Sequence, residues 1–248
     1  MSELLDAEFP MRLNRYIALC GVAARRKAEV LIASGRVTVG GAVETSVGRV
    51  LDGSSEVCVD GRAIAPVRSV YIVMNKPAGI LSAASDARER TVLDLLPKFY
   101  RPLGLFPVGR LDKESEGLII LTNDGGFAQE IIHPSAGVPR TYMVLLKAPM
   151  DEAVAERWRD GIVVDGRLLK PLDVTSADGG TQSRRWRIVL GDGLKREIRV
   201  MAEALGNKVI NLRRVGIGKL FLKKLPDGAF CEYNHHEINN MISCGGEV

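Results

Sequence analysis

The chain has 248 residues, of which 46% are hydrophobic and 26% charged, a composition typical of a folded protein with room for two modest domains. Its formal net charge of +4 and its pI of about 8.9 agree with an anionic partner without requiring one. Because the four cysteines form no C-x-x-C pair and no apolar run approaches the length of a membrane span, we expect a cytoplasmic protein with reduced cysteines, no metal site and no membrane association.

The stretch from residue 11 to about residue 65 predicts a small domain. Apolar residues at helical spacing from Leu13 to Cys20 predict a helix that ends at Gly21, and a second helix is expected between Ala23 and Gly35. Short strands separated by Gly-Gly and Asp-Gly turns are expected to follow, at Val37–Val39, Ala42–Val43 and Glu56–Val59.

Residues 70–238 predict a larger domain in which strands and helices mix without strict βαβ alternation. We therefore expect an α+β fold with a mixed, mainly antiparallel sheet. The predicted strands are Val70–Met74, Leu105–Val108, Gly117–Leu121, Thr141–Leu146, Arg184–Leu190, Val209–Leu212 and Lys219–Leu222, and the predicted helices are Thr91–Leu96, Met150–Arg159 and Arg196–Leu205. The tail from Asn239 to Val248 is expected to be disordered, with His235-His236 as a surface pair.

A cluster of cations lies on the two helices of the small domain and on the turn after them. A concentrated cationic face suits a phosphate backbone, because neutralising phosphates releases counterions. On charge alone, a solvated helix face is the commoner meaning of such a cluster. The cluster consists of Arg12, Arg15, Arg25, Arg26, Lys27 and Arg36.

The order of residues in this domain is more specific than its charge. The segment Met11–Glu29, followed by residues 32–41, resembles the alpha-L RNA-binding motif, a small module also found in ribosomal protein S-four. In that family the first two helices and the following turn bind structured RNA, so the resemblance implies RNA contact at all six cations. The domain has no plausible nucleophile, and we expect any chemistry to come from the larger domain.

In the larger domain, Asp112 follows a short apolar strand and Gly109, with Arg110 and Lys113 on either side. Loops held by a rigid sheet are where reactive residues usually lie. A lone Asp in a turn, however, is more often a cap or a turn former. Spacing alone therefore leaves both interpretations open for Asp112.

Two later segments offer partners for this carboxylate. Arg140-Thr141-Tyr142 opens a strand, where a half-buried tyrosine is the ordinary interpretation. Lys195, Arg196 and Arg199 lie at the start of a predicted helix, where cations oppose the helix dipole. These cations are therefore expected to have an anionic partner, which is RNA phosphate, Asp112 or both.

Residues 109–118, Gly-Arg-Leu-Asp-Lys-Glu-Ser-Glu-Gly-Leu, resemble the catalytic motif of the pseudouridine synthases. Within them, the chain is similar to the bacterial RsuA/RluB/RluF group, which carries an N-terminal alpha-L motif. Asn75-Lys76-Pro77 with Gly79, Arg140-Thr141-Tyr142 and Leu194–Met201 match further motifs of that group in the same order, so that the resemblance covers about 11–238. Lys195-Arg196-Glu197 departs from the aromatic or His and Gln of many relatives, whereas the basic position at Arg199 is retained.

The resemblance implies an isomerase that converts a uridine of ribosomal RNA into pseudouridine without a cofactor. Its partner would be ribosomal RNA or a ribosomal subunit precursor, with large-subunit RNA favoured over small-subunit RNA, and we expect a monomer. Asp112 would be the catalytic carboxylate, acting as a nucleophile on the ribose or by proton abstraction through a glycal. Arg199 would be its counter-charge, and Tyr142 would stack on the uracil. The expected substrate-binding residues are Arg110, Ile198, Lys195 and Arg196.

Two other classes of protein stay open at this point. A non-catalytic RNA-binding protein of ribosome assembly would explain the basic domain but not the set of Asp112, Tyr142 and Arg199. A hydrolase with paired carboxylates from Asp112, Glu114 and Glu116 is a weaker alternative. Aromatic residues, which bind sugars in such enzymes, make up only 5% of the chain.

Overall fold

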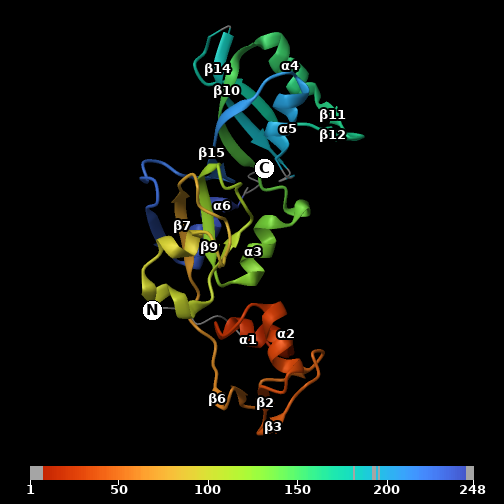
Figure 1. Ribbon diagram of the computed structural model, residues 1–248, viewed down its shortest axis with the longest axis vertical. Helices are drawn as coiled ribbons and strands as arrows, with labels where there is room; N and C mark the ends of the chain where they lie inside the picture. The colour runs from red at the N-terminus through yellow and green to blue at the C-terminus, as the bar shows by residue number, and fades with distance from the viewer. Residues whose placement is uncertain (1–7, 181, 192–193, 195, 244–248) are drawn as a thin grey trace.

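The computed structural model describes residues 8–180, 182–191, 194 and 196–243. Figure 1 shows an elongated molecule with a small N-terminal domain at one end and a larger, two-part domain above it. We call the small domain, from Met11 to Ala63, the basic module. None of the described helices is long and apolar enough to cross a membrane.

The basic module packs a helix pair against short strands. Its elements are β1 (Met11–Arg12), α1 (Leu13–Leu19), α2 (Arg25–Ala33), β2 (Val37–Val39), β3 (Ala42–Val43), β4 (Val50–Leu51), β5 (Val57–Val59) and β6 (Arg62–Ala63). Both predicted helices and the strands at β2 and β3 are confirmed, and β5 lies within the predicted 56–59. Leu13, Ile17, Ala28 and Ile32 are fully buried in the module's own core, as the helical spacing indicated.

One nine-stranded sheet runs through the larger domain. From edge to edge it contains β13 (Asp173–Ser176), β14 (Gln182–Leu190), β10 (Arg140–Asp151), β15 (Val209–Ile217), β9 (Glu116–Thr122), β7 (Tyr71–Lys76) and β17 (Phe230–Tyr233), with β16 (Leu220–Phe221) beside β15 and β8 (Phe106–Val108) beside β9. Every strand pair is antiparallel except β15 with β9. The prediction of a mixed, mainly antiparallel sheet is confirmed.

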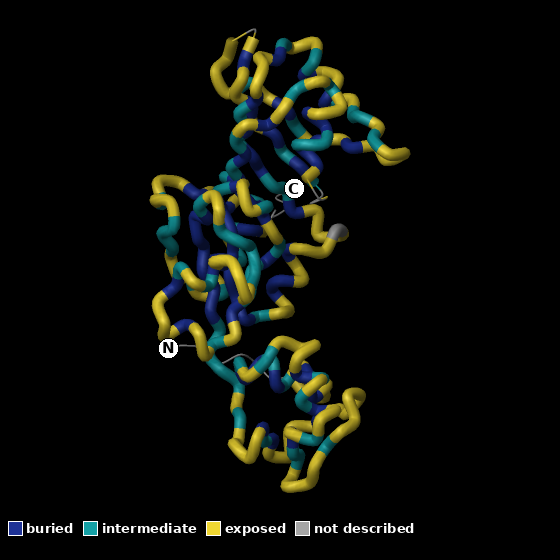
Figure 2. Tube along the Cα trace, in the orientation of Figure 1, coloured by how far each residue is buried: buried dark blue, intermediate teal, exposed yellow. Residues whose placement is uncertain are grey.

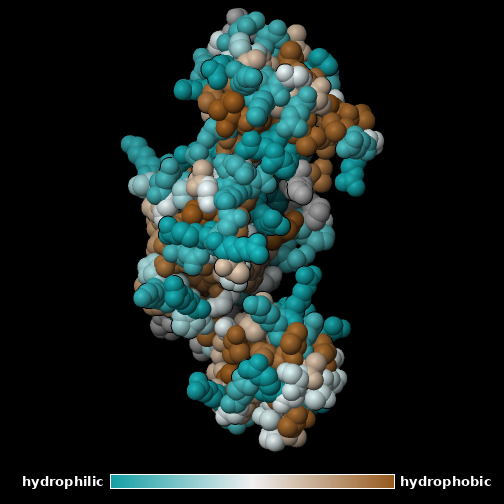
Figure 3. Space-filling model, in the orientation of Figure 1, coloured by the Kyte–Doolittle hydropathy of each residue, from teal (hydrophilic) through white to brown (hydrophobic). Residues whose placement is uncertain are grey.

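Helices and turns of 3-10 helix cover this sheet. They are η1 (Val92–Leu95), η2 (Lys98–Leu103), α3 (Gly125–Ile132), η3 (Pro134–Ala136), α4 (Glu152–Asp160), α5 (Glu197–Ala204) and α6 (His235–Ile242). A hairpin of β11 (Ile162–Val164) and β12 (Arg167–Leu169) projects from the far end. Val163 and Leu168 of this hairpin are exposed, and Figure 3 shows hydrophobic surface, in brown, where the hairpin projects.

The two halves of the sheet are buried in different ways. Strands β7 and β9 are covered on both faces, so alternate residues such as Val73 and Met74 enter different cores and the sequence is continuously apolar. Strands β10, β14 and β15 bury one face, against α4 and α5, around Trp158 and Trp186. Figure 2 shows the buried segments, in dark blue, along the strands of both halves.

Two helices were not predicted, and one of them corrects the expected disordered tail. Asn234 and Glu237 form a capping box that begins α6, and Ile238 and Ile242, one turn apart, are buried in the core. The helix therefore extends through residues 239–242, and the tail beyond residue 243 lies outside the described residues. His235 is half-buried, with its ring 5.4 Å from that of Tyr71, so within this pair only His236 is exposed.

The halves of the sheet meet at the parallel pair of β15 and β9, where only two residue pairs are in register. Gly117 stands there with φ at +105°, and a Cβ atom at this position would lie 2.1 Å from the carbonyl oxygen of Arg214. No side chain fits between backbones this close. Glycine is therefore required at the junction for both its conformation and its size.

We predict that Gly117→Ala lowers the free energy of unfolding by about 3 kcal/mol or more, because the positive φ and the clash with β15 act together. Gly125→Ala is the matched control, since its Cβ would meet nothing within 4 Å. Urea titrations of both variants measure the difference. Equal stabilities would show that the junction tolerates a side chain.

Candidate active site

The loop that carries Asp112 joins β8 to β9 and is bonded to neighbouring segments on both sides. Ser82 accepts from the backbone nitrogen of Leu111 at 3.1 Å, and its hydroxyl donates to the carbonyl of the same residue at 2.9 Å. The backbone nitrogen of Gly79 donates to the carbonyl of Lys113 at 2.8 Å. The loop is thus tied to residues 79–82, which follow the Asn75-Lys76-Pro77 segment in the chain.

A buried lysine is hydrogen-bonded to the backbone of this loop. Lys76, at the end of β7, is fully buried, and its Nζ donates to the carbonyls of Ser115 at 2.7 Å, Pro77 at 3.0 Å and Lys113 at 3.2 Å. Burial lowers the pKa of Lys76 to about 8, although the nearby carboxylates of Glu114, Glu116 and Asp112 act in the opposite direction. One ammonium group therefore holds the backbone on the C-terminal side of Asp112.

Two arginines from the start of α5 face Asp112. Its Oδ2 lies 3.5 Å from Nη1 of Arg196 and 3.9 Å from Nε of Arg199, and its side chain is 31% exposed. These separations are ion-pair distances that are too long for good hydrogen bonds. Both cations attract the carboxylate while leaving its oxygens free to reach another molecule.

The two arginines are held differently. Arg199 is largely buried, and its Nη atoms donate to the carbonyl of Val209 at 3.2 Å and to Oγ of Ser115 at 3.5 Å. Arg196 is exposed and has a left-handed backbone (φ +57°), which is uncommon for a residue other than glycine. Arg199 is therefore buried beside the loop, whereas the side chain of Arg196 lies at the rim.

A cleft opens beside Asp112. Its volume of about 640 Å³ lies within the range of small-molecule binding sites. Tyr142 of β10 and Ile198 of α5 line it, and both are buried. Leu190, Leu212 and Ile217 add apolar walls. The cleft thus combines an apolar interior with a carboxylate at its edge, which suits a flat, weakly polar ring joined to a polar group.

Two further arginines line the cleft, and sequence reasoning gave them no role. Arg214 of β15 is 5% exposed, and its Nε donates to the carbonyl of Leu118 at 2.8 Å. Arg140 donates to the carbonyls of Gly191 at 2.8 Å and Ile131 at 3.0 Å. The signal for Arg214 was its position two residues after Leu212, on the inward face of an apolar strand.

The structure brings most of the predicted site residues together. Arg110, Asp112, Tyr142, Arg196 and Ile198 all line the cleft, and Arg199 reaches Asp112 from its side. Lys195 lies outside the described residues. Among the described residues, no group of three or more His, Cys, Asp or Glu side chains could hold a metal ion.

The carboxylates near Asp112 are engaged elsewhere or exposed. Glu116 accepts from Asn211 at 2.7 Å and lies 3.4 Å from Nη1 of Arg213. Glu114 is exposed and does not line the cleft. Neither Glu114 nor Glu116 therefore forms the expected carboxylate pair with Asp112 in the cleft, where the other lining carboxylate is Glu197 at the start of α5.

The six cations of the basic module are all exposed. Within the described part of the chain, five of them form no ion pair, whereas Arg36 is bonded to Asp60 at 2.7 and 2.5 Å. Both side chains of that pair are about half exposed, so the pair contributes little to stability and can exchange for a phosphate.

Comparison with known proteins matches the larger domain and the basic module to two different families. Residues 70–204 match the RNA pseudouridylate synthase family, and residues 11–63 match the S4 domain. A crystal structure of a pseudouridylate synthase superposes with a TM-score of 0.66 at 26% identity, covering 94% of this chain and 100% of that one.

Two curated relatives match over nearly their whole length. An uncharacterized RNA pseudouridine synthase of Aquifex aeolicus is 35% identical over 239 residues, which is 95% of each chain. The ribosomal large subunit pseudouridine synthase B of Bacillus subtilis is 35% identical over 234 residues, covering 93% of this chain and 95% of that one.

The depressed pKa of Lys76 predicts a pH dependence of stability. The folded chain releases this proton near pH 8, whereas the ordinary value is 10.5, so the unfolded chain binds more protons between those values. The free energy of unfolding therefore gains a component that rises with pH across this window. Urea titrations should show that Lys76→Met lacks the rise, while Lys223→Met, at an exposed position, retains it. Parallel curves for wild type and Lys76→Met would contradict the assignment.

Proposed function

This chain belongs to the RNA pseudouridylate synthase family, and from that membership we propose that it isomerises a specific uridine of ribosomal RNA, in the large subunit. The exposed cations of the basic module support an RNA substrate, because they offer a phosphate-binding face on the same chain as the cleft. The large-subunit choice rests on the Bacillus subtilis relative, which is named for that subunit. Small-subunit RNA is the alternative.

The observation that carries the proposed chemistry is a single carboxylate beside two cations at the edge of an apolar cleft. The reaction breaks the bond between C1′ of the ribose and N1 of uracil, turns the base and joins C1′ to C5. The proton of C5 is lost and N1 gains one, so no further reactant is consumed. We assign Asp112 the step at the ribose, as a nucleophile or as a base that leads through a glycal.

The freed uracil must stay in place while it turns, which is a task of positioning. We assign this task to Tyr142 and Ile198, since both are buried and line the cleft. The ring of Tyr142 would stack on the base, and its hydroxyl would assist proton transfer at C5. Ile198 would form the apolar wall opposite.

The cations around the cleft receive separate roles. Arg199 is the proposed counter-charge of Asp112, because it is largely buried and its Nε lies 3.9 Å from the carboxylate. Arg110 and Arg196 are exposed at the rim, where they would bind the phosphates on either side of the extruded nucleotide. Extrusion itself costs a few kcal/mol, less in a loop or bulge.

We further propose that the chain divides between residues 65 and 70 into an RNA-binding module and a catalytic domain of residues 70–238. We also propose that the active form is a monomer. Since its proposed substrate is ribosomal RNA, the protein would act in the cytoplasm.

Asp112→Asn should reduce pseudouridine formation to background while RNA affinity is retained, because the substitution keeps the shape of the side chain and removes its charge. Glu114→Gln, an exposed carboxylate two residues away, should retain activity. Mapping pseudouridine across total ribosomal RNA from deletion cells complemented with each variant measures the effect and identifies the uridine. An active Asp112→Asn enzyme would refute the assignment, and a map without any lost position would refute the ribosomal substrate.

Changing Arg25, Arg26 and Lys27 together to Gln should weaken binding to structured RNA and flatten its salt dependence, by a slope of roughly 0.7–0.9 per lost phosphate contact. The matched control changes the exposed Lys219, Lys223 and Lys224 to Gln, which alters net charge equally. Filter binding over a salt series measures both slopes. If the two triple variants behave alike, net charge rather than the module's face determines binding.

A further inference from the structure

The basic module contacts the larger domain through two glycines. Gly21 follows α1 with φ at +71°, and a Cβ atom there would lie 2.4 Å from the carbonyl oxygen of Pro102 in η2. Gly104 follows η2 with φ at +68°, and its Cβ would lie 3.0 Å from the Cα of Gly21. The two backbones therefore touch directly, and neither position has room for a side chain.

A second contact holds the same end of α1. The backbone nitrogen of Val67, in the segment between the domains, donates to the carbonyl of Leu19 at 3.1 Å. The side chains of Leu19 and Met11 form a small buried cluster against which Val67 packs. The end of α1 is thus bonded to the connecting segment and pressed against η2, and both contacts restrict rotation of the module.

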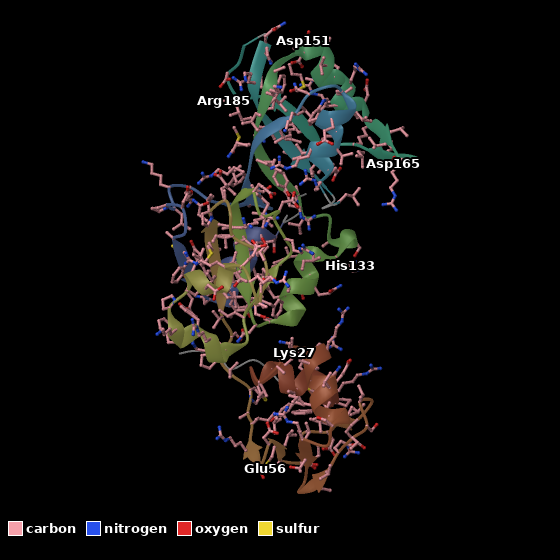
Figure 4. All side chains as sticks on the ribbon, in the orientation of Figure 1. Lys27, Glu56, His133, Asp151, Asp165 and Arg185 are labelled. Atoms are coloured by element: carbon pink, nitrogen blue, oxygen red, sulfur yellow. The ribbon has the colours of Figure 1, made fainter. Side chains whose placement is uncertain are left out.

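The turn at Gly21 leads within a few residues to the start of α2, where Arg25, Arg26 and Lys27 are exposed. Lys27 lies on the edge of the module that faces the larger domain (Figure 4). A change in the angle at the glycine contact would therefore move these cations relative to the cleft that contains Asp112.

We propose that the contact between Gly21 and Gly104 is a specificity determinant, which fixes the separation between the module's cations and the cleft. This role rests on the proposed function and specifies the class of RNA substrate. That class is folded RNA in which a phosphate-rich helical element lies at one set distance from the extruded uridine.

The physical basis is the binding of one molecule at two linked sites. When two sites are held at a fixed spacing, the second contact is intramolecular and strong for a ligand of matching span. A loosely tethered module would also raise affinity for RNA. It would, however, bind RNAs with many different spacings between the two contact points, and the effective concentration at each spacing would be lower. A rigid backbone contact therefore favours one arrangement of RNA over others.

The test compares Gly21→Ala with Gly35→Ala. Gly35 follows α2 with φ at +72°, so alanine suffers the same backbone strain, but its Cβ would meet only Val43, at 3.6 Å. Gly104→Ala is compared in the same way with Gly179→Ala, whose φ is +67° and whose Cβ would meet nothing within 4 Å. Each pair separates loss of the domain contact from strain at a positive φ.

Each variant is assayed on two RNAs: the folded ribosomal fragment that contains the mapped uridine, and a short loop that reaches only the cleft. Gly21→Ala and Gly104→Ala should lower kcat/KM on the folded fragment by about tenfold or more relative to their controls. Activity on the short loop should match that of the controls. Urea titration of all four variants confirms that each is folded at the assay temperature.

Two results would overturn the inference. In the first, each contact variant equals its control on both RNAs, so the contact has no effect on substrate choice. In the second, both RNAs lose activity equally, so the glycines act on folding or on the chemistry. If the wild-type chain forms no pseudouridine in either RNA, the proposed function fails instead. The inference is then decided by whether affinity for the folded fragment falls in the contact variants and not in the controls.

Discussion

A buried ammonium holds the loop on which the proposed chemistry depends. Placing the charge of Lys76 inside the sheet is unfavourable unless its donors are satisfied, and here three carbonyls satisfy them. Two of those carbonyls belong to the loop of Asp112, so the loop cannot move away without leaving the charge uncompensated. The position of the carboxylate is therefore fixed by a contact that Asp112 itself does not make.

The cleft forms where the two halves of the sheet meet. Asp112 comes from the loop before β9, in one half, whereas Tyr142 and Arg199 come from β10 and α5, in the other. The halves are joined at Gly117, where the backbones approach too closely for any side chain. Small relative rotations of the halves would change the distance from Asp112 to Arg199, and the tight junction opposes them.

The motifs in the sequence predicted which residues lie together at the candidate site, but not every element around it. Asp112, Tyr142 and Arg199 were identified because their motifs occur in order along the chain, and the structure gathers them around one cleft. The role of Lys76 was not visible, since its partners are carbonyls, which every residue has.

Two of the differences from the predicted elements have a common physical cause. Helix α3 begins with Gly125-Gly126, which are poor helix formers, and depends on the cap that Asp124 provides. Strand β10 was predicted to end at Leu146, but it continues to Asp151 past Pro149 through an irregularity in register. In both cases contacts in the folded protein outweigh local preference.

The order of the strands in the chain has a consequence for how the protein is made. Strand β17 completes the edge beside β7, and α6 closes the core below it, yet both follow every other described element of the larger domain. During synthesis, the edge of β7 that pairs with β17 therefore lacks its hydrogen-bonding partner until nearly all of the domain has left the ribosome. The basic module has a core of its own and is able to fold first, so RNA affinity precedes a finished cleft on the growing chain.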